Sequence, residues 1–236
     1  MKTIILAGGL GTRISEETID KPKPMVQIGA HPVLWHIMQI YAHQGFNDFI
    51  IATGYKSKVI EDYVEVRRDF GKIENVSALN TGLETSTGGR IKLAMELAGN
   101  ERVFATYGDG VADIDLSALI EFHERHGGLA TLTAVHPPAR FGRLELSEGR
   151  VTHFGEKMQS QDGWINGGFF ILEPEVAHYI PDLETPFEHD PLVNLALDGQ
   201  LFAYKHEGFW QPMDTLRERN ELQQLWNADS APWKIW

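Results

Sequence analysis

Short, almost continuously apolar runs recur along the first half of the chain, and each ends in small or polar residues. A run of this kind is typical of a strand that is buried on both faces of a parallel sheet. The pattern therefore predicts four such strands, at residues 2–7, 48–54, 102–108 and 129–135.

Segments with apolar side chains at helical spacing separate these runs. The first of them places Leu34, Ile37, Met38 and Tyr41 on one face. The helices predicted in this way cover residues 32–44, 57–70, 89–98 and 115–126. Alternating strands and helices indicate right-handed crossovers, so we expect an α/β fold with a doubly wound, mostly parallel sheet. Such a sheet binds ligands at the carboxyl ends of its strands.

The pattern changes after Val135. The later elements that the sequence predicts are a β-hairpin with strands at 143–146 and 151–154, further strands at 164–172 and 201–205, short helices at 174–180 and 190–197, and a last helix at 215–226. We expect one domain over residues 1–236. Its nucleotide-binding half would cover about 1–135 and its substrate-binding half about 136–236, with the cleft between them.

Charge and composition narrow the range of partners. The chain carries 33 acidic and 21 basic residues, a net charge of -12, which argues against general binding of nucleic acid or anionic membranes. Cysteine is absent, which excludes disulfides, thiolate metal sites and cysteine nucleophiles. The apolar run at the N-terminus is too short for a signal peptide, and no apolar stretch approaches the roughly 20 residues of a membrane span. We therefore expect a cytoplasmic protein.

A glycine-rich turn directly follows the first predicted strand. Gly8, Gly9 and Gly11 would let backbone N–H groups approach phosphate oxygens, because no Cβ stands in the way. The turn lacks the Lys-Ser/Thr pair of a P-loop and the third glycine of a dinucleotide fingerprint, so a tight turn without a ligand is the alternative. Two prolines stiffen the loop at 21–25 that follows, so that Arg13 and Lys23 would be held near a triphosphate.

These two motifs together, G-G-x-G-T-R at 8–13 and K-P-K-P-M at 21–25, resemble the signature of sugar-1-phosphate nucleotidyltransferases. The residues from Gly8 to Met25 are most similar to those of the glucose-1-phosphate cytidylyltransferase branch of this family. Later stretches that match the same branch, in order, are 87–90, 106–113, 165–170, 208–215 and the ending at 231–234. The likeness thus covers nearly the whole chain and implies a Rossmann-like nucleotidyltransferase fold.

The resemblance implies transfer of a nucleotidyl group from a nucleoside triphosphate, CTP by this branch, to a sugar 1-phosphate, with Mg²⁺ as cofactor and often a homo-oligomer as the assembly. It assigns catalytic roles to Arg13 and Lys23. The nucleotide-binding residues that we expect are Leu6, Ala7, Gly8, Gly9, Gly11, Thr12, Arg13, Lys23, Thr85, Gly88, Arg90 and Gly108. By the resemblance, Thr85 and Gly88, together with Ser86, would read the base, and Arg90 would approach the nucleotide phosphates. A helix N-cap without a ligand is the alternative for Thr85 and Ser86.

Two carboxylates stand out as metal ligands. Asp109 lies just past a predicted strand, and Asp214 follows a loop near the end of the chain. Two carboxylates and phosphate oxygens form a hard site that suits Mg²⁺, and the resemblance implies this role, whereas a solvated turn is the alternative for Asp109. Asp113 and Asp115 form an Asp-x-Asp pair like a glycosyltransferase metal site, but Asp115 stands where a helix N-cap is expected.

The sugar phosphate has its own predicted contacts. Glu156 and Lys157 resemble the family's E-K element, and Asn166 and Gly167 match its sugar-binding strand. The family usually has proline where this chain has Met158, and a surface ion pair at the end of the hairpin is the alternative for Glu156 and Lys157.

The sequence leaves several functions open. A uridylyl-, thymidylyl- or other nucleotidyltransferase of the same fold is the first alternative, since the segment from 64 to 77 is shorter than expected for the cytidylyltransferase branch. A non-catalytic nucleotide-sensing domain should have lost Arg13, Lys23, Asp109 or Asp214, all of which are present. A nicotinamide oxidoreductase is disfavoured by the missing fingerprint. The histidines show no metal-binding spacing, and Phe209, Trp210 and Trp226 are expected in the core.

Overall fold

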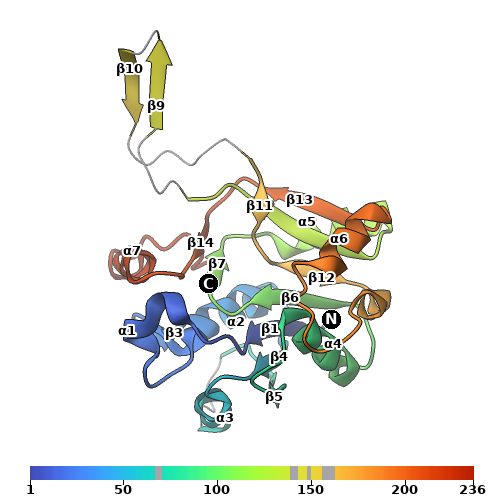
Figure 1. Ribbon diagram of the computed structural model, residues 1–236. Coiled ribbons are helices and arrows are strands. Elements are labelled where there is room, and N and C mark those ends of the chain that lie inside the picture. The colour runs from blue at the N-terminus through green and yellow to red at the C-terminus, as the bar shows by residue number, and fades with distance from the viewer. Residues whose placement is uncertain (67–70, 139–142, 148–149, 156–162) are drawn as a thin grey trace.

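An eight-stranded sheet forms the centre of the computed structural model (Figure 1). The structure describes residues 1–66, 71–138, 143–147, 150–155 and 163–236. The strands of the sheet are β1 (Thr3–Ala7), β4 (Asp48–Thr53), β5 (Asn75–Asn80), β6 (Val103–Tyr107), β8 (Ala130–Val135), β11 (Ile165–Asn166), β12 (Phe170–Leu172) and β13 (Leu201–His206).

Most strands of this sheet are parallel. The order is β11-β8-β12-β6-β1-β4-β5, and β13 pairs in parallel with β8. β1 pairs in parallel with β4 and β6, and β4 pairs in parallel with β5. β12 is antiparallel to both of its neighbours, β6 and β8, and β11 is antiparallel to β8. The predicted α/β fold with a mostly parallel sheet is therefore confirmed, and strands from both halves of the chain share the one sheet.

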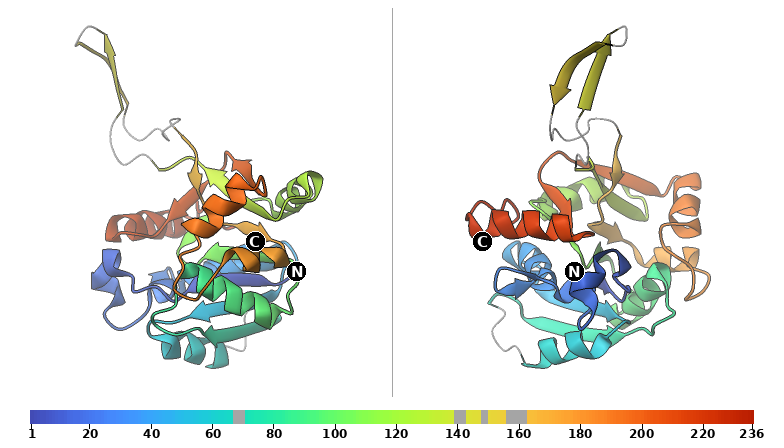
Figure 2. Two further views of the ribbon diagram at one scale, coloured as in Figure 1. Left: turned by 45° about the vertical axis from the view of Figure 1, so that its right-hand side comes forward. Right: turned by 60° about the vertical axis from the view of Figure 1, so that its left-hand side comes forward.

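Helices cover both faces of the sheet, as the apolar runs required. Ile5 and Ala7 of β1 face one core cluster, and Ile4 and Leu6 face the other. The first cluster includes buried residues of α2 (Val33–His43), α3 (Ser57–Val66) and α5 (Leu116–His126). The second includes residues of α4 (Thr87–Ala98), the 3₁₀ helix η3 (Pro174–Tyr179) and α6 (Asp190–Leu197). Figure 2 shows this layering from two further sides.

The remaining described elements frame the edge of the sheet. They are η1 (Thr12–Ile14), α1 (Ser15–Thr18), η2 (Lys23–Met25), the pair β2 (Gln27–Ile28) and β3 (His31–Pro32), the ribbon of β7 (Gly110–Ala112) with β14 (Trp210–Pro212), and α7 (Leu216–Asn227). β9 (Arg143–Ser147) and β10 (Arg150–Gly155) form the predicted hairpin, which extends away from the sheet (Figure 1). The β7–β14 ribbon brings the segment around residue 214 beside the end of β6, where the backbone N of Met213 donates to the carbonyl oxygen of Asp109 at 2.8 Å.

The structure corrects several predicted boundaries. The strand expected at 164–172 is two strands, because Gly168 and Phe169 have φ of 80° and 45° and interrupt the extended backbone. The helix expected at 174–180 is a 3₁₀ helix, and α4 begins at Thr87 rather than at residue 89. The helix predicted for 57–70 is described only as far as Val66.

Local signals explain where helices begin and end. The side chain of Asp115 accepts a hydrogen bond from the backbone N of Ala118 at 3.0 Å, so the predicted N-cap of α5 is confirmed. Gly127 ends that helix with φ of 65°. Thr215 and Glu218 form a capping box at the start of α7, just after Asp214.

A buried aromatic cluster ties the C-terminus to α2. His36 is fully buried among Trp35, Trp226 and Trp233. Its Nε2 lies 2.9 Å from the carbonyl oxygen of Ile28, and the indole N–H of Trp233 donates to its Nδ1 at 3.4 Å. Burial lowers the pKa of His36 to about 4, so the neutral imidazole belongs to the folded state.

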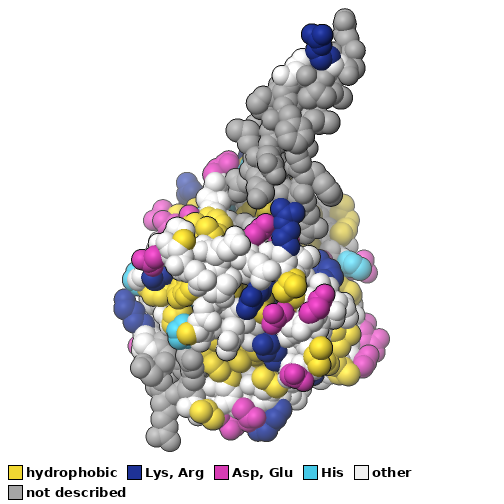
Figure 3. All heavy atoms as spheres, turned by 90° about the vertical axis from the view of Figure 1, so that its left-hand side faces the viewer, with side chains coloured by type: hydrophobic (Ala, Val, Ile, Leu, Met, Phe, Trp, Pro, Cys, Tyr) yellow, Lys and Arg dark blue, Asp and Glu magenta, His cyan; other side chains and the backbone are white. Residues whose placement is uncertain are grey.

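The surface around α1 and α7 carries both signs of charge. Figure 3 shows basic and acidic side chains interspersed on this side of the molecule. In the described part of the chain, the helices all fall short of the length and apolar character that crossing a membrane requires.

Candidate active site

The glycine-rich turn lies at the carboxyl end of β1, between that strand and η1. Gly11 has φ of 66°, a left-handed conformation that suits glycine. A Cβ at Gly8 would collide with the guanidinium of Arg90, so a larger residue there would have to displace that side chain from its hydrogen bonds. The carbonyl oxygen of Gly8 accepts from the backbone N of Tyr55 at 3.2 Å and from Arg90 at 3.3 Å. The turn is therefore held in place by two other segments.

Lys23 joins the two predicted metal ligands. Lys23 is 8% exposed to solvent. Its Nζ lies 2.5 Å from Oδ2 of Asp109 and 2.5 Å from Oδ1 of Asp214. The guanidinium of Arg13 contacts the other carboxylate oxygen of Asp214 at 2.6 Å. Four charged residues that are up to about two hundred positions apart in the sequence thus form one connected group. We call Arg13, Lys23, Asp109 and Asp214 the charged cluster.

The electrostatics of Lys23 follow from these contacts. Burial by itself lowers the pKa of this lysine, but the neighbouring carboxylates, Asp109 first, raise it above its ordinary value of 10.5. Lys23 therefore stays an ammonium ion at neutral pH. It neutralises two carboxylates that would otherwise repel each other.

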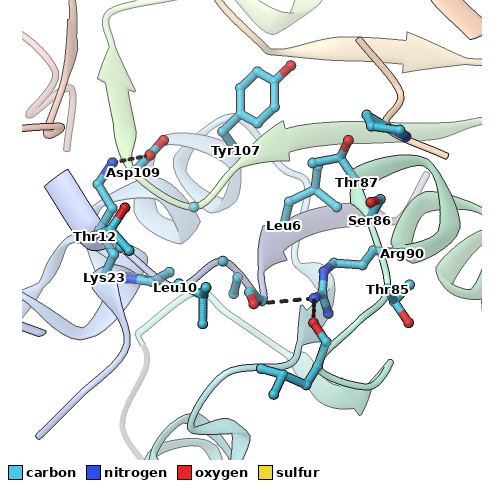
Figure 4. Close-up of a pocket in the computed structure, with 18 of the residues that line it drawn as sticks. Leu6, Leu10, Thr12, Lys23, Thr85, Ser86, Thr87, Arg90, Tyr107 and Asp109 are labelled. Carbon is cyan, nitrogen blue, oxygen red and sulfur yellow. Dashed lines mark hydrogen bonds and ion pairs between the residues drawn. The ribbon is translucent and has the colours of Figure 1, made fainter. Parts of the chain in front are cut away.

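A cavity of about 590 Å³ opens above the glycine-rich turn. Figure 4 shows Lys23 and Asp109 at one end of it and Thr85, Ser86, Thr87 and Arg90 at the other. Of the predicted nucleotide-binding residues, those that line this first cavity are Leu6, Ala7, Gly8, Gly9, Gly11, Thr12, Arg13, Lys23, Thr85, Arg90 and Gly108. Arg13 and Lys23 thus lie at the end where a triphosphate would meet the charged cluster.

Gly88 is the predicted nucleotide-binding residue that does not line this cavity. It is buried in α4, where a Cβ would come within 2.5 Å of the carbonyl oxygen of Thr185. Its small size lets the helix pack closely against the segment at 185–187. The structure therefore gives Gly88 a packing role, and its contact with a nucleotide stays a prediction.

Arg90 has partners other than the phosphates that the sequence suggested. It is 4% exposed, and its guanidinium donates to the carbonyl oxygens of Thr53 at 2.7 Å and Gly82 at 3.0 Å, as well as to Gly8 and to the hydroxyl of Thr81. No carboxylate pairs with it among the described residues, and burial lowers its pKa. Arg90 thus braces the glycine-rich turn against the segment at 81–83.

The loop expected to read the base stands at the start of α4. Ser86 is the N-cap residue but makes no side-chain capping bond, and the hydroxyl of Thr85 donates to the carbonyl oxygen of Thr81 at 2.5 Å. The alternative of a side-chain N-cap is therefore wrong for both. Both residues line the first cavity.

A second cavity, of about 750 Å³, lies on the other side of the charged cluster. Arg13, Asp109 and Asp214 line it, and so does Asn166, one of the predicted sugar contacts. Gly167 does not; its carbonyl oxygen accepts from the indole N–H of Trp210 at 2.8 Å. The other two predicted sugar-phosphate residues, Glu156 and Lys157, lie outside the described residues.

Several residues that line these cavities were not predicted from the sequence as ligand-facing positions, among them Tyr107, Glu188 and Trp210. Tyr107 and Glu188 line both cavities, and Trp210, expected in the core, lines the second one. Tyr107 belongs to the motif at 106–113, which was matched to the family without a role for each of its residues. Glu188 follows no strand and belongs to no recognised motif, so only the fold reveals it.

The Asp-x-Asp pair takes no part in the charged cluster. Asp115 caps α5, and Oδ1 of Asp113 lies 3.0 Å from Nε2 of His206. Among the described residues, no group of three or more His, Cys, Asp or Glu side chains could hold a metal by itself. A metal at Asp109 and Asp214 would need further oxygens from a ligand.

Comparisons with known proteins agree with this geometry. Residues 2–213 match the model of the nucleotidyl transferase family. The chain is 48% identical to the glucose-1-phosphate cytidylyltransferase of Salmonella typhi and 42% identical to a probable glucose-1-phosphate cytidylyltransferase of Bacillus subtilis, each over the full length of both chains. The structure resembles that of a putative glucose-1-phosphate thymidylyltransferase from Bacillus anthracis, with a TM-score of 0.72, 19% identity and coverage of 98% of this chain and 95% of that one. The sequence, the fold and the family match agree, and the chain belongs to the nucleotidyl transferase family.

Proposed function

We propose that this enzyme transfers the cytidylyl group of CTP to glucose 1-phosphate, giving CDP-glucose and pyrophosphate. The observation that carries the proposal is the position of the charged cluster between two cavities, with Arg13 and Asp109 lining both. The full-length similarity to the glucose-1-phosphate cytidylyltransferases of Salmonella typhi and Bacillus subtilis supports the choice of base and sugar.

The two cavities suit the two substrates. The glycine-rich turn and Lys23 at the first cavity would bind the triphosphate through backbone N–H groups and an ammonium ion. Asn166 at the second cavity offers an amide that both donates to and accepts from sugar hydroxyls. Glu156 and Lys157, by resemblance, would contact the sugar and its phosphate. The reacting phosphates would then meet at the charged cluster.

The reaction needs alignment and charge neutralisation more than acid–base chemistry. The second pKa of a phosphate monoester is near 6, so at neutral pH its oxygen is already largely an anion and needs no general base. This oxygen attacks the α-phosphorus of CTP in line, forming the new P–O bond as the bond to pyrophosphate breaks. Arg13 and Lys23 would stabilise the negative charge that grows on the departing pyrophosphate.

Asp109 and Asp214 would hold the Mg²⁺ ion. The fit rests on their contacts with Lys23, because one oxygen of each carboxylate lies 2.5 Å from the same Nζ and both therefore converge on one small cation. Two carboxylates with phosphate oxygens make the hard oxygen set that Mg²⁺ prefers. When bound, the ion would polarise and neutralise phosphate oxygens.

A substrate panel tests the proposal. Pyrophosphate release is measured with each of CTP, UTP, dTTP, ATP and GTP against glucose 1-phosphate, galactose 1-phosphate and mannose 1-phosphate. CTP with glucose 1-phosphate should have the highest kcat/KM. A higher value with UTP or dTTP would overturn the cytidylyl assignment and favour another transferase of the family. The homo-oligomer that the resemblance implies stays a prediction, which light scattering in solution would test.

A further inference from the structure

Glu188 is a carboxylate at the boundary between the two cavities, and the reaction as derived above does not use it. It lies in the segment between η3 and α6, just before α6 begins. It lines both the first and the second cavity, as Tyr107 does. It is therefore placed where parts of both substrates would come together.

Two hydroxyl groups hold this carboxylate in a fixed orientation. The hydroxyl of Thr87, at the start of α4, donates to Oε2 at 2.6 Å, and the phenol of Tyr107, at the end of β6, donates to Oε1 at 2.8 Å. The backbone N of Phe187 donates to the hydroxyl oxygen of Thr87 at 2.8 Å, so the hydroxyl proton of Thr87 is left to donate to Glu188. Within the described part of the chain, each carboxylate oxygen thus has one protein donor.

The chain of hydrogen bonds continues to the predicted sugar contact. The side-chain amide of Asn166 donates to the phenol oxygen of Tyr107 at 3.0 Å, and its own carbonyl accepts from the backbone N of Gly168 at 2.9 Å. Burial first, and the charge of Glu188 second, raise the pKa of Tyr107. The phenol therefore keeps its proton and directs it to Glu188.

Charge distinguishes Glu188 from the carboxylates of the charged cluster. Asp109 and Asp214 are neutralised by Lys23, whereas no lysine or arginine among the described residues pairs with Glu188. A carboxylate accepts about four hydrogen bonds, so two protein donors leave acceptor capacity toward the cavities. An unpaired negative charge repels phosphate oxygens, but it attracts uncharged hydroxyl donors strongly.

We infer that Glu188 accepts a hydrogen bond from a sugar hydroxyl of the substrates and so determines specificity for that hydroxyl. The hydroxyl belongs either to the ribose of the nucleotide or to the hexose, since Glu188 faces both cavities. Tyr107 and Thr87 act as positioning residues that aim the carboxylate. The inference rests on the proposed function for the identity of the two sugars.

Equilibrium binding of the product tests this inference, because CDP-glucose carries both sugars. The Kd is measured by calorimetry for CDP-glucose, for its 2′-deoxy- and 3′-deoxyribose analogues and for its 2-, 3-, 4- and 6-deoxyglucose analogues. The proteins are the wild type, Glu188→Gln and the matched control Glu184→Gln, which changes the same charge at an exposed position of the same segment. Thermal unfolding of each variant establishes that it is folded.

A hydrogen bond to a charged acceptor predicts that Glu188→Gln weakens CDP-glucose binding about tenfold to a hundredfold. Binding of the one analogue that lacks the contacted hydroxyl should be unchanged by the substitution, and this analogue identifies the ribose or the hexose as the source. Tyr107→Phe keeps the carboxylate of Glu188 but removes the hydrogen bond from the phenol that orients it. This variant should therefore weaken binding through the same hydroxyl less than Glu188→Gln does. Glu184→Gln should bind every ligand like the wild type.

The inference would be overturned if Glu188→Gln weakened the binding of every ligand by the same factor, or weakened the binding of none of them. Turnover of CTP and glucose 1-phosphate by the wild type is recorded separately. Absence of turnover counts against the proposed function, while the ratios of Kd values still decide the role of Glu188. Should Glu188→Gln fail to fold, the same ratios are taken from Tyr107→Phe, and an equal loss across ligands there would also overturn the inference.

Discussion

Replacing Lys23 by Met tests the charged cluster most severely. Methionine keeps the length and apolar stem of the side chain but removes the ammonium ion that contacts Asp109 and Asp214 at 2.5 Å each. Two carboxylates would then face each other, and Arg13 would be the one cation among the described residues that still contacts either of them. The substitution separates the electrostatic role of Lys23 from its packing.

The burial of the charged cluster determines how much free energy of unfolding Lys23→Met should lose. Removing one partner of a fully buried ion pair costs about 3–5 kcal/mol. The side chains of Asp109 and Asp214 are 29% and 15% exposed, and Arg13 still contacts Asp214, so water and the remaining cation reduce the cost. We expect the free energy of unfolding to fall by about 2 kcal/mol in the absence of metal, which is below the range for a buried pair.

Magnesium should restore part of this loss. In the wild type, an added cation has to compete with the ammonium of Lys23. In Lys23→Met this competitor is gone, although Arg13 still contacts Asp214, so the two carboxylates should bind the cation more tightly. A tenfold tighter Kd adds about 1.4 kcal/mol of stabilisation at saturating metal. Urea unfolding with and without Mg²⁺ therefore should show a larger stabilisation by metal in the variant than in the wild type.

Lys21→Met is the matched control, because Lys21 belongs to the same loop and, among the described residues, its ion-pair partner is Glu17 at 3.8 Å. It should unfold like the wild type under both conditions. If Lys23→Met had the free energy of unfolding of the wild type and the same response to Mg²⁺, the cluster would not be held together by this lysine.

Three other substitutions test separate parts of the site and the core. Asp214→Asn should raise the Mg²⁺ concentration for half-maximal pyrophosphate release about tenfold or more; an unchanged requirement would remove Asp214 from the metal site. Arg90→Lys keeps the charge but loses the fork that braces the glycine-rich turn, so calorimetry should show CTP binding weakened about tenfold; unchanged binding would contradict the bracing role. The pKa of His36 is about 4 when folded and 6.5 when unfolded, so the unfolded state binds more protons as pH falls between these values. Between pH 7 and pH 5 the wild type should therefore lose about 2 kcal/mol of unfolding free energy more than His36→Gln in urea titrations, and parallel losses would refute the shifted pKa.

The parts of the fold that the sequence predicted well are those with a strong local signal. β1, β4, β6 and β8 are largely buried on both faces, so their apolar runs are continuous, and the predicted ends lie within one residue of the ends in the structure. β5 was missed, because it lies at the edge of the sheet and its residues Asn75–Asn80 mix polar and apolar side chains. The short β7–β14 ribbon was missed as well, since three-residue strands carry too little pattern to be recognised.

In the candidate site, too, residues with a strong local signal were predictable from the sequence, and residues whose contacts depend on the fold were not. Residues of the glycine-rich turn, Lys23 and Asp109 follow strand ends or stiff loops, so their neighbourhood was predictable from local sequence. The contacts of Arg90 and Glu188 were not, because each depends on segments far apart in the chain: Glu188 meets Thr87 across 101 positions and Tyr107 across 81. The sequence indicated which residues carry charge, but only the fold shows which of them are neutralised.

In the proposed reaction, the bond that forms and the bond that breaks both lie at the α-phosphorus of CTP. The most direct measurement follows the label from CTP that carries ³²P at the α or the γ position, incubated with glucose 1-phosphate, Mg²⁺ and the enzyme. We expect α-label to appear in CDP-glucose and γ-label in pyrophosphate, in equal amounts. Transfer of γ-label to the sugar, or release of α-label as CMP without CDP-glucose, would contradict it.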